Sequence, residues 1–140
     1  MLFRPAAYYE SRDIMNLKEF YDFIGEDYNE VIGRLRSESR VYKYVMKFPD
    51  DKSFDSLISS MKEKNYAEAF RAAHTIKGTG LNFSFNGFAA VASEITEKLR
   101  NFEDTAAIES DPDLDGLIKD ASEKYEKIIS GIKQIDPIEQ

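Results

Sequence analysis

Residues 66–83 read Y-A-E-A-F-R-A-A-H-T-I-K-G-T-G-L-N-F. On a helical wheel at roughly 100° per residue, one face of this stretch consists mostly of small side chains. Its members fall within about 60° of one direction, and they are Ala69, Ala72, Ala73, Ile76, Gly80 and Phe83. Small side chains let neighbouring helices approach closely, so we expect this stretch to be a helix packed inside a helical bundle.

Apolar residues recur at the three- and four-residue spacing of a helix on both sides of this stretch. The pattern predicts further helices near residues 17–24, 28–35, 41–48, 54–61, 88–102 and 114–132. No stretch alternates between apolar and polar residues over the length of a strand, and the connections between the last four helices are short. The sequence therefore predicts an all-α fold. We expect an antiparallel, up-down four-helix bundle from Phe54 onward, with additional short N-terminal helices packed on one end.

Three polar residues are typical of helix starts. Asn65 precedes the central helix, and Glu68 stands three residues later, where it can reach back to Asn65 in a capping box. Asn86 is expected to cap the next helix, and Asp111 followed by Pro112 is expected to begin the last one.

The chain has 140 residues, the size of one domain, and its 42% hydrophobic residues suffice for a core. We expect a single helical domain over residues 16–135. The opening residues show no clean periodicity. Two interpretations fit residues 1–15: a flexible N-terminal arm, or a stretch left by the choice of the gene start.

The composition disfavours several classes of partner and site. The chain has 19 Lys and Arg against 26 Asp and Glu, and this net charge of −7 disfavours both nucleic acid and an anionic membrane surface. It has no cysteine, hence no disulfide and no thiolate metal site. No apolar run is long enough to span a membrane, and the N-terminus lacks the apolar core of a secretory signal. We therefore expect a soluble, cytoplasmic and monomeric protein.

His74 is the one histidine of the chain, and it falls outside the core face, at about 140° from Ala69 on the wheel. Lys77 and Gly78 follow one turn later. A glycine inside a helix costs roughly 1 kcal/mol relative to alanine, and Gly78 points away from the core, where packing does not require it. An outward glycine beside an exposed histidine indicates that another molecule comes very close, and Lys77 indicates that the arriving group is anionic.

The arrangement of His74, Lys77 and Gly78 indicates phosphoryl transfer. Imidazole is a nucleophile near neutral pH and can accept a phosphoryl group at a ring nitrogen. We predict that His74 is the phospho-acceptor, that Lys77 contacts the phosphate, and that Gly78 leaves clearance for the partner.

Three further residues are candidates for partner binding. Phe70 and Leu81 lie on the same side of the helix as His74, either as part of a docking surface or as the edge of the bundle core. Arg71 either contacts an acidic pocket of the partner or is simply solvated.

Other chemistries lack the residues they need. A single histidine without a Glu-x-x-His pair cannot build the usual zinc or di-iron site. No carboxylate lies three or four residues from His74 to orient it as a hydrolytic base, and the sequence has no nucleotide-binding motif. We therefore expect a carrier that has no cofactor or metal and no kinase or phosphatase active site of its own. The catalytic acids and Mg²⁺ are expected in the partner.

Residues 73–78, A-H-T-I-K-G, resemble the signature of histidine-containing phosphotransfer (HPt) domains, which usually reads A-H-x-L-K-G. Ile76 replaces the usual leucine, and Ser84 stands where glycine is common in the turn that follows. The resemblance is strongest over residues 65–99, and the helical layout extends it to the last helix.

The resemblance implies a bundle that presents a phosphorylated histidine to solvent and exchanges the phosphoryl group with the aspartate of a response-regulator receiver domain. It implies the same roles for His74, Lys77 and Gly78 as the chemistry does. A hybrid sensor histidine kinase is a further candidate partner. The alternative is a non-catalytic helical interaction module with an HPt-like fold that does not transfer phosphate.

Overall fold

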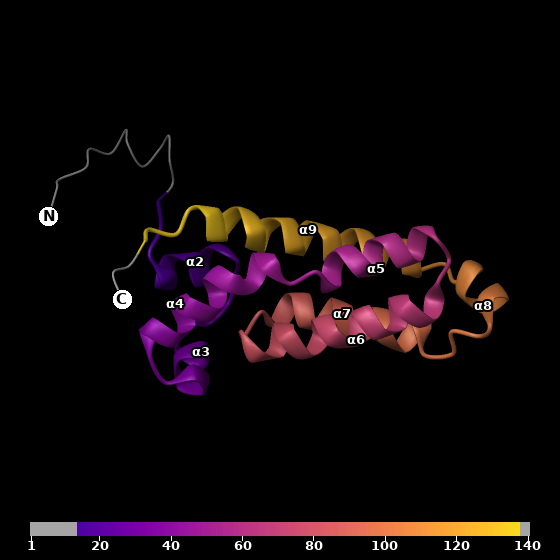
Figure 1. Ribbon diagram of the computed structural model, residues 1–140, viewed down its shortest axis with the longest axis horizontal. Helices are drawn as coiled ribbons and strands as arrows, with labels where there is room; N and C mark the ends of the chain where they lie inside the picture. Colours follow the sequence, from indigo (N-terminus) through magenta and orange to yellow (C-terminus); the bar gives the residue numbers. More distant parts are fainter. Residues whose placement is uncertain (1–13, 138–140) are drawn as a thin grey trace, which may run out of the picture.

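The computed structural model describes residues 14–137, and the all-α prediction is confirmed (Figure 1). Over these residues the one β-type pairing is an isolated parallel bridge between Met15 and Ile135. The elements are α2 (Leu17–Phe23), α3 (Tyr28–Leu35), α4 (Glu38–Lys47), a 3-10 turn (Phe48–Asp50), α5 (Ser53–Lys62), α6 (Tyr66–Asn82), α7 (Asn86–Leu99), α8 (Thr105–Glu109) and α9 (Leu114–Lys133).

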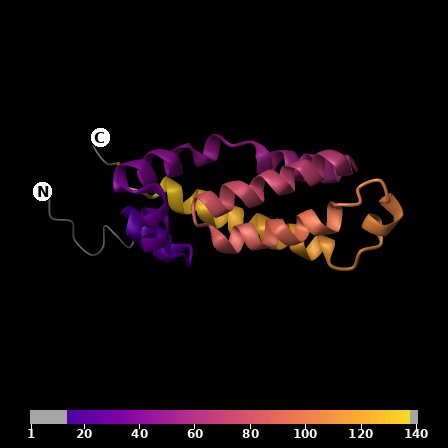
Figure 2. The same cartoon turned by 90° about the horizontal axis from the view of Figure 1, so that it is seen from below.

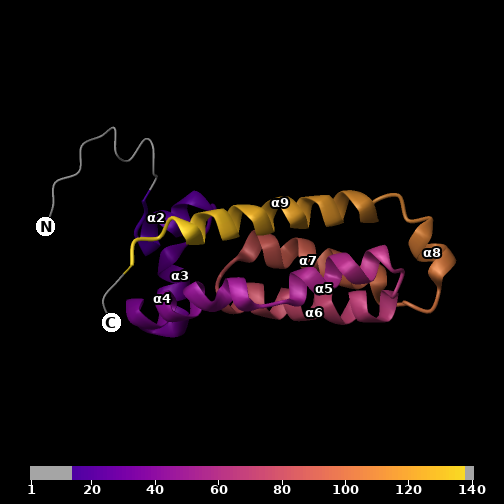
Figure 3. The same cartoon turned by 45° about the horizontal axis from the view of Figure 1, so that its top comes forward.

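Four long helices, α5, α6, α7 and α9, lie side by side along the long axis of the molecule (Figures 1, 2 and 3). Helix α6 packs against α5 on one side and α7 on the other, and α7 packs against α9. In Figure 1 the turn from α5 to α6 and the segment carrying α8 lie at one end, while the turn from α6 to α7 lies at the other.

The shorter helices α2, α3 and α4 cover the end of the bundle where α6 turns into α7. Their junction with the bundle is built from buried aromatic rings, with Phe85 in contact with both Phe48 and Phe20 at ring-centroid distances of 5.3 and 6.1 Å. Both pairs meet edge to face, the arrangement that aromatic rings prefer. Gly131 of α9 completes the junction, because a Cβ there would lie 2.8 Å from the ring of Phe20.

The start of α7 departs from the prediction. Asn86 was expected to cap this helix, but it is the first helical residue, and Phe85 before it offers no side-chain cap. The backbone cap comes instead from Glu26, in the loop between α2 and α3, and a side-chain contact with Glu30 of α3 supports it. The carboxylate of Glu26 accepts a hydrogen bond from the Gly87 N–H at 2.8 Å, and the Asn86 amide donates to Glu30 at 3.0 Å.

The other two predicted helix starts are partly right. The Asn65 side chain accepts from the Glu68 N–H at 3.3 Å and so caps α6. The capping box is incomplete, because the Asn65 N–H donates to the Ser60 carbonyl and the Glu68 carboxylate binds Arg71.

Helix α9 begins at Leu114, three residues after the predicted cap. The Asp111 carboxylate instead accepts from the Asp113 N–H at 2.9 Å and pairs with Lys98 of α7 at 3.0 Å. This contact ties the start of α9 to the end of α7.

Most of the predicted N-terminal arm, residues 1–13, lies outside the described residues. Met15 is hydrogen bonded to the end of the last helix: its N–H donates to the Gln134 carbonyl at 2.8 Å, and its carbonyl accepts from Asp136 at 2.7 Å. None of the described helices is long and apolar enough to cross a lipid bilayer.

Candidate functional site

Helix α6 presents two faces of different character. The predicted core face is buried at Ala69, Ala72, Ala73, Ile76 and Gly80, and Phe83 is partly buried at the end of the helix. Alanine favours the helix and leaves room for close packing. A Cβ on Gly80 would lie 3.0 Å from the Cβ of Ala89 on α7, so glycine permits the observed closeness of these two helices.

His74 is exposed, one residue after the fully buried Ala73. Its ring lies nearly parallel to that of Phe70, one turn earlier, with 6.3 Å between the ring centroids and 11° between the planes. The apolar ring on this side leaves the rest of the imidazole open to solvent and to an incoming group.

Lys77, one turn after His74, is half-buried. The pKa of Glu97 on α7 lies below its ordinary value, mainly because Arg100 donates hydrogen bonds to this carboxylate, and the positive charge of Lys77 acts in the same direction. Lys77 therefore lies near Glu97, yet among the described residues no carboxylate forms an ion pair with it. Its ammonium group retains donors for an added anion.

Gly78 is exposed, and a Cβ placed on it would meet nothing within 4 Å outside its own helix backbone. Packing inside the chain therefore does not require glycine here. The contrast with Gly80, two residues later, separates an open position from a crowded one on the same helix.

The three candidate partner-binding residues differ in their surroundings. Phe70 is partly buried: its ring packs against Phe102 at 5.7 Å, and the Arg100 guanidinium lies over it at 5.4 Å. Leu81 keeps 45% of its surface exposed. Arg71 is exposed and binds Glu68, one turn earlier, at 2.6 Å.

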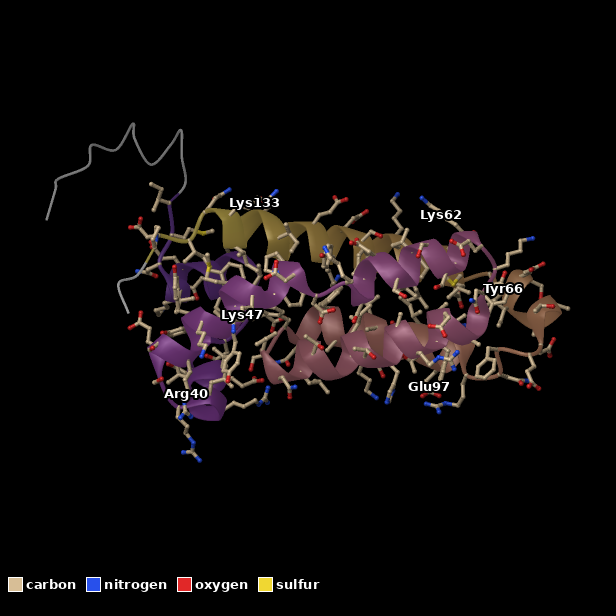
Figure 4. The ribbon with its side chains drawn as sticks, in the orientation of Figure 1. Arg40, Lys47, Lys62, Tyr66, Glu97 and Lys133 are labelled. Carbon is tan, nitrogen blue, oxygen red and sulfur yellow. The ribbon has the colours of Figure 1, made fainter. Side chains whose placement is uncertain are left out.

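Sequence reasoning missed the residues that α7 and the segment directly after it add to this face. Arg100 and Phe102 contact the ring of Phe70, and Glu97 lies close enough to Lys77 for the lysine charge to lower its pKa, although at least 20 residues separate the members of each pair in the sequence. In Figure 4 Glu97 lies on the lower edge of the molecule, toward the end where α6 begins. The sequence carried one local signal, the three-residue spacing of Glu97 and Arg100, which form an ion pair at 2.7 Å.

Within the described residues, no three His, Cys, Asp or Glu side chains are grouped so that they could hold a metal ion. What the arrangement offers chemically is an exposed nucleophile, a nearby cation and an open backbone position.

A comparison with protein families matches residues 50–127 to the model of the Hpt domain. The chain belongs to the Hpt domain family. The match runs from the 3-10 turn into α9 and includes all of α5, α6 and α7, whereas α2, α3 and α4 precede it. Neither the curated proteins nor the solved structures gave a match to this chain.

Hpt domains are phosphocarrier modules of two-component phosphorelays, and they interact with response-regulator receiver domains. The family therefore supports phosphotransfer as the activity of this chain.

Proposed function

We propose that this Hpt domain accepts a phosphoryl group on His74 and exchanges it with the aspartate of a response-regulator receiver domain. One observation carries the proposal: the one histidine of the sequence lies inside the matched region and is exposed on α6, on the side away from the core. A histidine kept for packing would be expected among the buried residues, and His74 is not among them.

The proposed step conserves charge and atoms without a cofactor in this chain. A ring nitrogen of His74 attacks the phosphorus of the receiver's aspartyl phosphate, and a nitrogen–phosphorus bond forms as the oxygen–phosphorus bond breaks. The electron pair of the broken bond leaves with the aspartate carboxylate, and the other ring nitrogen releases its proton to solvent. The reverse sequence returns the phosphoryl group. We expect Mg²⁺ and the catalytic acids to be supplied by the receiver.

The neighbours of His74 have distinct proposed roles. Lys77 donates hydrogen bonds to the phosphoryl oxygens as a point charge, because its ammonium has no ion-pair partner in the described structure. Gly78 leaves room for the receiver to approach the imidazole. Phe70 and Leu81 provide apolar contact on either side of the histidine along the helix.

The exposed Arg71 lies beside this surface and is expected to contribute little, because it is already paired with Glu68. We further propose that the domain acts as a monomer in the cytoplasm.

Transfer to a His74→Gln variant tests the proposal. A receiver domain phosphorylated with labelled acetyl phosphate and Mg²⁺ is mixed with the full chain or with the variant. We expect acid-labile label on the native chain and none on the variant, with equal melting temperatures because His74 is exposed.

Two other results would contradict the assignment. Acid-labile label on the variant would place the phosphoryl group elsewhere. Receiver binding without labelling of the native chain would favour the interaction module that keeps the fold but does not transfer phosphate.

A further inference from the structure

The charges of this acidic chain are unevenly distributed. Between residues 31 and 49, five of the six charged residues are cationic, whereas between residues 101 and 126 nine of the eleven are acidic. The first segment forms α3 and α4 at one end of the molecule, and the second forms α8 and most of α9, starting from the opposite end (Figure 1). Although the net charge of the chain is −7, the end of the molecule formed by α3 and α4 is therefore cationic.

The cations of α4 share one face of the helix. Arg40, Lys43 and Lys47 follow each other at spacings of three and four residues, and all three are exposed. Val41 and Val45 are fully buried on another side of the same helix. Arg36, also exposed, stands just before α4 at the end of α3. We call Arg36, Arg40, Lys43 and Lys47 the cationic face.

Carboxylates do not neutralise the cationic face. The one acidic residue of α4, Glu38, lies toward Tyr28: the pKa of this tyrosine is raised mainly by burial and further by the charge of Glu38. None of the four cations forms an ion pair with any residue between 14 and 137. Elsewhere on the molecule lysines are paired, such as Lys98 with Asp111 at 3.0 Å and Lys124 with Asp120 at 2.6 Å.

The helices that carry this face are attached to the end of α6. Arg34 of α3 donates hydrogen bonds to the carbonyl of Leu81 and to the hydroxyl of Ser84. Leu81 stands seven residues after His74, which corresponds to about 10 Å along the helix axis. In Figure 4 Arg40 and Lys47 lie at the same end of the molecule as the C-terminus of α6.

A partner centred on His74 is large enough to cover the end of α6, where α3 is attached. A standard protein interface buries about 800 Å² on each side, which corresponds to a disc of about 16 Å radius. Leu81 and the Arg34 side chain that contacts its carbonyl fall inside that radius, and α4 follows α3 directly. Figure 2 shows α3 and α4 just beyond the end of α6.

We propose that the cationic face is a second part of the receiver-docking surface, which steers the acidic side of a receiver domain toward His74. This inference rests on the proposed function. Its chemical basis is complementarity: the receiver reacts through an aspartate and through the acids that hold Mg²⁺, so the surface around its reactive group is acidic. Exposed charges of this kind act mainly by raising the rate of encounter. The cationic face lies outside residues 50–127, in the N-terminal helices that precede the matched Hpt region of this chain.

Two triple variants of equal charge test the proposal. The first carries Arg40→Gln, Lys43→Gln and Lys47→Gln, and the control carries Lys62→Gln, Lys119→Gln and Lys133→Gln. The control lysines are exposed on α5 and α9, and Figure 4 shows Lys62 and Lys133 along the upper edge, away from Arg40. The probe is the receiver domain that labels or binds the native chain fastest among those encoded in the same genome. Melting curves verify that both variants are folded.

We expect the first variant to lose about tenfold in the second-order rate constant of transfer at low ionic strength, with the rate at saturating receiver unchanged. Its remaining rate should depend less on salt than that of the native chain. The control should stay within twofold of the native chain.

Equal rates for the two variants, with the native chain labelled, would overturn this inference and leave the proposed function intact. If the receiver binds the native chain without labelling it, the proposed function fails. The inference is then decided by comparing the rates at which the two triple variants and the native chain bind the receiver. If neither chain binds any receiver, both fail. Equal receiver binding, combined with loss of binding to phosphatidylserine vesicles or to DNA in the first variant alone, would assign the face to a membrane or a nucleic acid instead.

Discussion

Gly78 and Gly80 stand two residues apart on α6 and face opposite environments. A Cβ on Gly80 would lie 3.0 Å from the Cβ of Ala89 and 3.3 Å from its backbone, whereas a Cβ on Gly78 would meet nothing within 4 Å. The same residue type therefore serves two purposes on one helix. Gly80 allows α7 to approach, and Gly78 leaves a bare stretch of backbone on the surface, one turn from His74.

Gly78→Ala should separate stability from transfer. Alanine is the better helix former, and the added methyl group has free space, so we expect a gain of up to roughly 1 kcal/mol in the free energy of unfolding. The same methyl group should hinder the receiver, giving weaker binding and slower transfer, with Gly78→Leu worse than Gly78→Ala. Paired melting curves and transfer assays measure both effects. A variant that melts lower but transfers normally would assign Gly78 to packing.

Gly80→Ala provides the matched comparison. The contact with Ala89 at 3.0 Å involves side chain and backbone of a packed helix, so the methyl group forces α6 and α7 apart. Overpacking of this kind costs about 1–3 kcal/mol, which exceeds the gain in helix propensity. We expect a net loss of about 1 kcal/mol in denaturant unfolding, while the saturating transfer rate stays near that of the native chain. Stabilisation equal to that of Gly78→Ala would show that the two helices can relax.

Local periodicity was enough to predict the helices and the core face of α6. Ala69, Ala73 and Gly80 are buried as the wheel predicted, because burial along one helix depends only on the direction of each side chain. The cap of α7 could not be predicted in this way. Its acceptor, Glu26, lies 61 residues before Gly87, and only the packing of the N-terminal helices brings them together. Helix α8 was missed because five residues are too few to show a period.

At the candidate site, too, some features follow from the periodicity of one helix and others depend on how the helices pack. The exposure of His74 and of Leu81 follows from their positions on a single helix. The half-burial of Phe70 does not, because it depends on Phe102, which the end of α7 brings against it. The proximity of Glu97 to Lys77 likewise depends on how α6 and α7 pack.

Lys77→Ala should slow transfer without preventing docking. A charge-assisted hydrogen bond contributes about 1.5–3 kcal/mol when it is well placed and less when it is exposed to solvent. We expect a loss of several-fold in the rate constant or in the lifetime of the phosphohistidine, with receiver binding within twofold of the native chain. Lys62→Ala, an exposed lysine on α5, is the control for loss of one positive charge. Unchanged kinetics of Lys77→Ala at low salt would leave Lys77 without a role at the phosphoryl group.

Tyr21→Phe should loosen the junction between the N-terminal helices and the end of α6. The Tyr21 side chain is fully buried, and its hydroxyl donates to the Phe83 carbonyl at 2.8 Å. Phenylalanine keeps the ring contacts and leaves that carbonyl without this donor, which costs about 1–2 kcal/mol. Chemical denaturation measures the loss. Tyr44→Phe is the control, because Tyr44 is exposed and its change should have almost no effect. Equal stability of the two variants would mean that water replaces the lost donor.

The cap of α7 should make part of the stability depend on pH through Glu26. Burial is the main cause that raises the pKa of this carboxyl, and the charge of Glu30 adds to it, while the N–H groups of Gly87 and Asn86 oppose the rise. Lys124 of α9 lines the same surface pocket as Glu26 and Gly87. A carboxyl whose pKa is raised by folding favours the folded state when it is protonated. Its contribution is therefore fully present below its ordinary pKa and is lost as the pH rises through the raised value.

Glu26→Gln tests this sign directly. Glutamine keeps an oxygen that can accept from the Gly87 N–H, and it never becomes charged. We expect the variant to equal the native chain in stability at acidic pH and to match or exceed it at neutral pH, where the native carboxylate is ionised and partly buried. Glu26→Ala removes the acceptor as well and should be less stable than the native chain at both pH values. Urea unfolding of the three proteins across this range is the measurement. A Glu26→Gln variant that loses stability as the pH rises toward neutral, relative to the native chain, would show that the charge of Glu26 at the start of α7 stabilises the fold more than its burial opposes it.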